Sequence, residues 1–164
     1  MSKKKISACF LGVVMLGNVL AAQGEETVEM PKPEGEAVWK YISQENPFNE
    51  WTIWEDHQGT DGPDSSFSPS HKLYVNKQAV DSKSVPLNNE SMAVSYIRSP
   101  ADEPQAIVVM YKVKGYNPTA GDWFWARYSL TGEVEDSGKI PRCIACHTKK
   151  AADNDYIITH KFDK

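Results

Sequence analysis

The chain has 164 residues, enough for one domain of ordinary size, and 40% of them are hydrophobic, 24% charged and 10% aromatic. Its 10 glycines and 10 prolines form no repeat, so the composition excludes collagen, a coiled coil and a wholly disordered chain. The formal net charge is -4 and no run of basic residues follows Lys3-Lys4-Lys5, which excludes nucleic acid and anionic lipid as partners.

The first 21 residues are typical of a secretory signal peptide. Lys3-Lys4-Lys5 gives a positive start, Ile6 to Leu20 is largely apolar, and Val19-Leu20-Ala21 supplies a small-residue cleavage site. The apolar run is shorter than the roughly 20 residues that a membrane span needs. We therefore expect residues 1–21 to be removed on export to the periplasm, leaving a mature chain without a membrane span.

An acidic segment follows the predicted signal peptide. Gln23 to Glu36 carries five glutamates and two prolines but almost no apolar side chains. Such a composition does not support a packed core, so residues 22–35 are predicted to form a flexible arm. The folded domain is expected over residues 36–164.

One helix and four strands are predicted in this domain before residue 130. Hydrophobic residues recur at helical spacing from Ala37 to Ile42, and Asn46-Pro47 ends the pattern. Residues 51–69 are polar and rich in Gly, Asp and Ser, which indicates a loop. Four apolar runs with strand character follow, each bounded by turn residues: Leu73–Asn76, Met92–Ile97, Ala106–Val113 and Trp123–Tyr128. We expect an α+β fold that is mainly β, with an antiparallel sheet flanked by short helices.

Near the C-terminus, Cys143-Ile144-Ala145-Cys146-His147 is the C-x-x-C-H pattern of covalent c-type haem attachment. Two thiols three residues apart lie on one side of a helical turn, where each can add to a vinyl group. The imidazole of His147 is then placed to bind the iron. Pro141 suits the first position of a short helix. The sequence predicts one covalent haem c per chain, with His147 as the metal ligand.

The same cysteines are compatible with two other chemistries. A thioredoxin-like redox pair normally precedes most of its fold, whereas only 18 residues follow Cys146. A zinc site would combine Cys143, Cys146, His147 and His160, but adjacent Cys and His ligands crowd one tetrahedron. Haem is favoured, and the predicted export agrees with it because c-type haem is attached outside the bacterial cytoplasm.

The sequence around the haem motif carries a family resemblance. Val109 to Pro118, Gly121 to Tyr128, and the Gly132-Glu133-Val134 and Ser137-Gly138-Lys139 segments together resemble the cytochrome P-460 and cytochrome c′-β family. The resemblance implies a mainly antiparallel β fold, a homodimer and a five-coordinate haem. It also implies an open distal side that reacts with a small gaseous or nitrogenous ligand, such as nitric oxide or hydroxylamine.

Two branches of this family differ on the distal side. In the P-460 branch a lysine is joined to the porphyrin and hydroxylamine is oxidised, which makes Lys72 and Lys77 candidates here. In the c′-β branch phenylalanines cap the iron and a gas binds, which makes Phe67 and Phe48 candidates. Strand alternation places Lys72 on the opposite face from Leu73. Neither lysine has the spacing expected for the link, so gas binding is favoured and enzymatic activity is left open.

Further residues complete the predicted site. Arg127 and Arg98 are expected to pair with haem propionates, and Glu133 is a candidate for moving protons. The alternative function is simple electron transfer by a six-coordinate haem. The candidate sixth ligands are His57, His71, His160, Met92 and Met110. A periplasmic electron-transfer partner is expected for this protein.

Overall fold

The computed structural model describes residues 28–55, 72–99, 101–158, 160 and 162. Its centre is a six-stranded sheet in which every neighbouring pair is antiparallel and the strand order follows the chain. The strands are β1 (Thr52–Glu55), β2 (Lys72–Val75), β3 (Met92–Arg98), β4 (Pro104–Lys112), β5 (Trp123–Tyr128) and β6 (Val134–Gly138). The predicted mainly β fold with an antiparallel sheet is confirmed.

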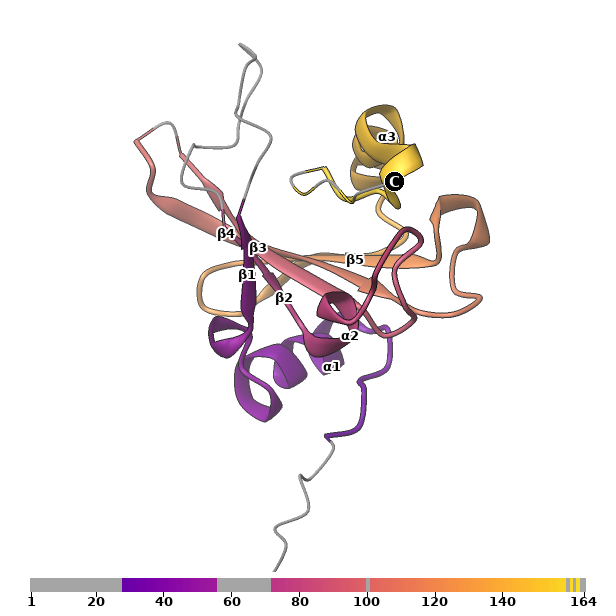
Figure 1. Cartoon of the computed structure of the whole chain (residues 1–164). Helices are drawn as coiled ribbons and strands as arrows, with labels where there is room; N and C mark the ends of the chain where they lie inside the picture. Colours follow the sequence, from indigo (N-terminus) through magenta and orange to yellow (C-terminus); the bar gives the residue numbers. More distant parts are fainter. Residues whose placement is uncertain (1–27, 56–71, 100, 159, 161, 163–164) are drawn as a thin grey trace, which may run out of the picture.

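Short helical elements lie on both sides of this sheet (Figure 1). They are α1 (Gly35–Lys40), η1 (Tyr41–Glu45), η2 (Phe48–Glu50), α2 (Lys77–Val80), η3 (Pro118–Ala120), α3 (Pro141–Ala151) and η4 (Ala152–Asn154). Within the described ranges, no helix is both long and apolar enough to cross a bilayer.

The four predicted strands correspond to β2, β3, β4 and β5, whereas β1 and β6 were not predicted. β1 lies in the segment expected to be a loop, and the side chains of β6 are exposed or half-buried along its length. Both are edge strands, which pair on one side only. An edge strand that buries few side chains lacks the apolar alternation by which a strand is recognised.

The face of the sheet toward α1 is filled by the chain's own side chains. Tyr128 is completely buried, and its hydroxyl donates to the carbonyl of Gly35 at 2.7 Å. Helix α1 passes directly into the π-helical turn η1, and Asn46 ends it as the sequence predicts. The buried residues of this helix-side core are Val38, Tyr41, Ile42, Phe48, Met92, Val94, Ile107, Val109, Tyr111, Phe124, Ala126 and Tyr128.

The predicted arm is partly packed against this core. The hydroxyl of Tyr41 contacts Met30 Sδ at 3.3 Å, and the hydroxyl of Tyr111 donates to the carbonyl of Pro31 at 3.1 Å. The folded part of the chain therefore includes residues that the sequence assigns to the flexible segment 22–35. The earlier residues of that segment lie outside the described residues, as does the predicted signal peptide.

The opposite face of the sheet supports α3 and the described residues that follow it, which Figure 1 shows on the other side from α1. Trp123 is completely buried on this face, and Trp125 is only 2% exposed. The buried residues of this second core are Leu73, Val75, Ala79, Leu87, Ala93, Met110, Ala120, Trp123, Trp125, Ile140 and Ile157. Because successive residues of a strand alternate between faces, the same four central strands serve both cores.

Candidate functional site

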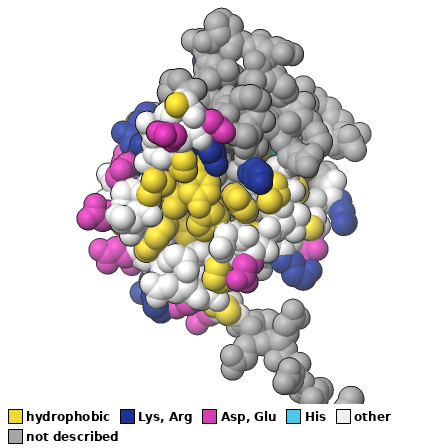
Figure 2. Space-filling view, turned by 90° about the vertical axis from the view of Figure 1, so that its left-hand side faces the viewer, with side chains coloured by type: hydrophobic (Ala, Val, Ile, Leu, Met, Phe, Trp, Pro, Cys, Tyr) yellow, Lys and Arg dark blue, Asp and Glu magenta, His cyan; other side chains and the backbone are white. Residues whose placement is uncertain are grey.

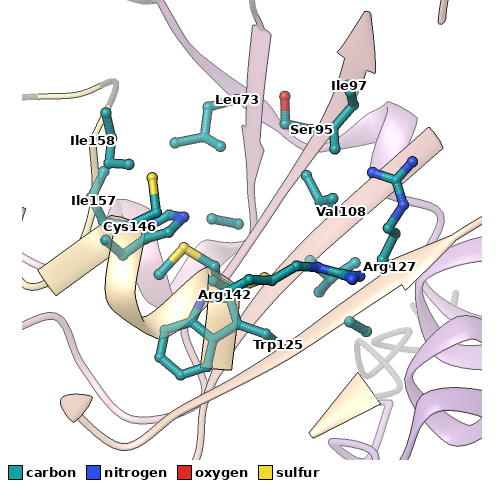
Figure 3. Close-up of a pocket in the computed structure, with 16 residues that line it drawn as sticks. Leu73, Ser95, Ile97, Val108, Trp125, Arg127, Arg142, Cys146, Ile157 and Ile158 are labelled. Carbon is teal, nitrogen blue, oxygen red and sulfur yellow. The ribbon is translucent and has the colours of Figure 1, made fainter. Parts of the chain in front are cut away.

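A cavity of about 280 Å³ lies between α3 and the sheet. In Figure 3, Cys146 and Ile158 lie on one side of it, and Leu73, Ser95 and Val108 lie on the strands opposite. Its walls are mostly apolar side chains, and Figure 2 shows hydrophobic side chains gathered in the middle of one face of the molecule. The cavity is lined by Leu73, Ala93, Ser95, Ile97, Val108, Val109, Met110, Trp125, Ala126, Arg127, Arg142, Cys143, Cys146, His147, Ile157 and Ile158.

Helix α3 brings both cysteines of the C-x-x-C-H pattern to this cavity. Pro141 opens the helix, where its missing N–H costs nothing, so the predicted helix start is confirmed. Cys143 is half-buried, Cys146 is exposed, and both are free thiols. Burial raises the pKa of the Cys143 thiol, and the neighbouring Arg142 partly opposes this shift. Two reduced thiols one helical turn apart are the arrangement that haem attachment requires.

His147 is oriented by the segment that follows α3. Its Nδ1 lies 2.6 Å from the carbonyl oxygen of Tyr156. A carbonyl only accepts hydrogen bonds, so Nδ1 carries the proton and Nε2 keeps its lone pair for a metal. The ring also meets Trp125 edge to face, with centroids 6.3 Å apart. His147 would therefore be able to bind a haem iron through Nε2.

Two arginines add positive charge to the cavity. Arg127 on β5 pairs with Glu135 at 2.5 Å, and Arg142 on α3 pairs with Asp136 at 3.0 Å. Both carboxylates belong to β6, so this edge strand orients both guanidinium groups. The sequence singles out Arg127 but not Arg142, although Arg142 immediately precedes the first cysteine. Arginines in this position are suited to the carboxylates of haem propionates.

These residues fit a covalently bound haem. The apolar walls suit the macrocycle, the two thiols suit the vinyl groups, and the arginines suit the propionates. In addition, the indole N–H of Trp125 is buried and has no hydrogen-bond partner among the described residues. A buried N–H without an acceptor is costly, and a haem propionate would supply an acceptor.

The zinc alternative finds no support. Across the described part of the chain, no group of three or more His, Cys, Asp or Glu side chains is placed to hold a metal ion. His160 instead stacks on Trp54 with ring centroids 4.4 Å apart.

The described candidates for the distal side, Lys72, Lys77 and Phe48, are not brought together. Lys72 is exposed and lies on the opposite face of β2 from Leu73, as strand alternation predicts, so it does not line the cavity. Lys77 pairs with Asp81 on the surface of α2. Phe48 is buried in the helix-side core, and Phe67 lies outside the described residues.

Other candidates also lie away from the cavity. The side chain of Glu133 is exposed and does not line it; Glu135, two residues later, is the carboxylate that reaches Arg127. Arg98 donates to the carbonyl of Asp102 at 2.6 Å and is likewise outside the lining.

Among the proposed sixth ligands, Met110 lines the cavity, whereas Met92 faces the helix-side core. His160 is outside the lining, and His57 and His71 lie outside the described residues. Among the described members of this set, Met110 is therefore the one that lines the cavity.

Comparison with known families gives one match. The family described as Cytochrome P460 matches residues 46–159 of the chain. No curated protein matches the sequence. The matched range runs from just before η2 past α3 to the segment that contains Tyr156, and so includes every residue that lines the cavity.

Proposed function

The chain belongs to the cytochrome P460 family and is a c-type haem cytochrome, and we propose that it binds or converts small nitrogen species at an open distal site. Nitric oxide and hydroxylamine are the ligands that the family resemblance implies. The observation that carries the proposal is the apolar wall of the cavity opposite α3.

The chain's own residues have distinct parts in this site. When bound, the haem supplies an iron centre that takes a small ligand and exchanges an electron. Cys143 and Cys146 would hold the macrocycle, and His147 on α3 would offer its Nε2 to the iron. Arg127 and Arg142 provide the charge that propionates require.

The wall opposite α3 offers a ligand almost no hydrogen bond. Leu73, Ala93, Val108 and Met110 are apolar, and the hydroxyl of Ser95 is engaged with the carbonyl of Lys72 at 3.1 Å. Distal polarity decides which ligands a haem retains. An apolar wall gives bound dioxygen no donor but leaves nitric oxide binding largely intact, which favours gas binding over oxidation chemistry.

The placement of the lysines supports the same choice. Neither Lys72 nor Lys77 lines the cavity, so the geometry supports a haem without a lysine link. A lysine-linked macrocycle shifts the ferrous Soret band strongly to the red. We expect an ordinary c-type Soret band and no lysine–porphyrin peptide in a protein digest.

Export, partner and assembly belong to the same proposal. Residues 1–21 have the pattern of a cleaved signal peptide, which supports a periplasmic protein with a periplasmic electron-transfer partner. The family resemblance supports a homodimer.

One observation favours a second candidate function. Met110 lines the cavity, and a thioether can fill the sixth position of a haem iron. A protein with this ligand would be a simple electron carrier.

Carbon monoxide binding separates the two functions. An open site in the reduced protein binds carbon monoxide readily, so we expect saturation without a slow ligand-displacement phase. Met110→Leu should then behave like the wild type, and Met92→Leu is the matched control because Met92 faces the other core. A wild-type protein that resists carbon monoxide, combined with a Met110→Leu variant that binds it, would establish the electron carrier instead.

A further inference from the structure

The hydrogen bond on His147 depends on an unusual piece of backbone. The acceptor is the backbone carbonyl of Tyr156. Tyr156 has a φ angle of 67°, and the preceding residue, Asp155, has a φ angle of 49°. Non-glycine residues are uncommon in this left-handed region and persist where surrounding contacts hold them. The orientation of His147 therefore depends on whatever fixes Asp155 and Tyr156.

A buried ion pair fixes Asp155. Lys112 Nζ lies 2.7 and 2.8 Å from the two carboxylate oxygens of Asp155. The two side chains are only 7% and 5% exposed. The backbone N–H of Leu87 donates to the same carboxylate at 2.7 Å. Breaking such a pair leaves a buried charge without compensation, so both partners are firmly held.

Trp123 and Gly121 extend this network to Tyr156. The indole N–H of Trp123 donates to the carbonyl of Asp155 at 2.9 Å. Lys112 Nζ donates to the carbonyl of Gly121 at 2.8 Å and lies 4.8 Å from the centre of the Trp123 ring. Gly121, with φ of 66°, also makes room for Tyr156, because a Cβ there would lie 2.7 Å from the tyrosine ring.

We propose that Lys112 and Asp155 are positioning residues for the axial histidine. The buried pair fixes the carbonyl of Tyr156, which keeps a proton on His147 Nδ1 and leaves Nε2 for the iron. An acceptor on Nδ1 makes the imidazole more basic, and a more basic ligand stabilises ferric relative to ferrous iron. This inference goes beyond the proposed function, because it concerns the axial ligand and not the molecule that binds at the distal site.

The test uses the haem-loaded protein and the double variant Lys112→Met/Asp155→Asn. This variant leaves no unpaired charge in the interior, and the asparagine keeps an oxygen for the N–H of Leu87. Losing such an outer hydrogen bond should shift the ferric-to-ferrous balance by about tenfold. That factor corresponds to a rise in reduction potential of about 59 mV. We also expect the Nδ1 proton of His147, followed by NMR, to exchange with solvent at least several times faster.

The matched control is Lys77→Met/Asp81→Asn, which removes an exposed ion pair at 2.6 Å on α2. It should change neither the reduction potential nor the exchange rate of the Nδ1 proton. If the first double variant does not fold, Trp123→Phe keeps a ring in the core and removes only the N–H that holds the Asp155 carbonyl. Trp123→Phe should raise the reduction potential and the exchange rate of the Nδ1 proton, each by less than the double variant does.

A folded variant of either kind with the wild-type potential and exchange rate would overturn the proposal. Neither readout involves carbon monoxide or a nitrogen species, so this inference and the proposed function can fail separately.

Discussion

The two faces of the sheet differ in what completes them. Toward α1, the helix-side core is filled by its own side chains, and even the hydroxyl of Tyr128 has a partner. Toward α3, the second core leaves a cavity of about 280 Å³ and a buried Trp125 N–H without a partner among the described residues. The same four strands supply both faces, because alternate side chains point in opposite directions.

This difference separates stability from function within one sheet. Close packing on the helix side provides the free energy that holds the strands in register. The α3 side gives up part of that packing and gains a site for a large prosthetic group. Substitutions on the two faces should therefore produce different defects.

The largest effect is expected from removing the attachment points. Cys143→Ala/Cys146→Ala should abolish covalent haem, since no thiol then remains on α3 for the vinyl groups. A haem-stained denaturing gel measures this, and Cys9→Ala is the control because Cys9 lies in the predicted signal peptide. Haem that leaves the wild type completely in acidic acetone would contradict covalent attachment.

The second effect compares two methionines on opposite faces. Met92 is completely buried in the helix-side core, so Met92→Ala should lower the free energy of unfolding by about 2–5 kcal/mol. Met110→Ala removes a side chain that already borders a cavity, so its cost should be smaller, and it should alter carbon monoxide affinity. Denaturant unfolding and gas titration measure the two properties. Equal losses of stability with unchanged gas affinity would contradict the distinction between the faces.

A pH effect is expected on the helix side. Burial raises the pKa of Tyr111 from 10.0 to about 12. The unfolded chain therefore loses this proton first as pH rises, and stability falls between pH 10 and pH 12, by at most about 1.4 kcal/mol per pH unit. Below pH 10, the stabilisation that comes from the raised pKa of Tyr111 is fully present.

Tyr111→Phe should remove this part of the alkaline loss. Its destabilisation relative to the wild type, which comes from the lost hydrogen bond to Pro31, should shrink as pH rises through that window. Unfolding curves measured from pH 8 to pH 12 would show this change. A difference in the free energy of unfolding between wild type and Tyr111→Phe that stays constant with pH would contradict the prediction.

The smallest effect concerns charge at the cavity. Arg127→Gln removes a cation from its lining and should lower the reduction potential, because a nearby positive charge favours the reduced haem. The expected change is on the order of 1 kcal/mol or less. Arg98→Gln is the matched control, because Arg98 lies outside the lining and should leave the potential unchanged.

Chemistry that is local in the chain can be predicted from the amino-acid sequence. Cys143, Cys146 and His147 are recognisable because haem attachment needs them at fixed spacing on one helix. The strands β2 to β5 are recognisable because each carries an apolar run between turns, and the alternation in β2 correctly separates Lys72 from Leu73. The edge strands β1 and β6 bury too little to leave such a pattern.

The distant residues that serve the site could not be predicted, because they meet only when the chain is folded. Lys112 and Asp155 are 43 positions apart and share no motif, and the acceptor for His147 is a backbone carbonyl, which every residue has. Met92 and Met110 look alike in the sequence, yet only Met110 reaches the cavity. A contact across a sheet depends on strand register and face, because a shift of one residue would exchange the two faces.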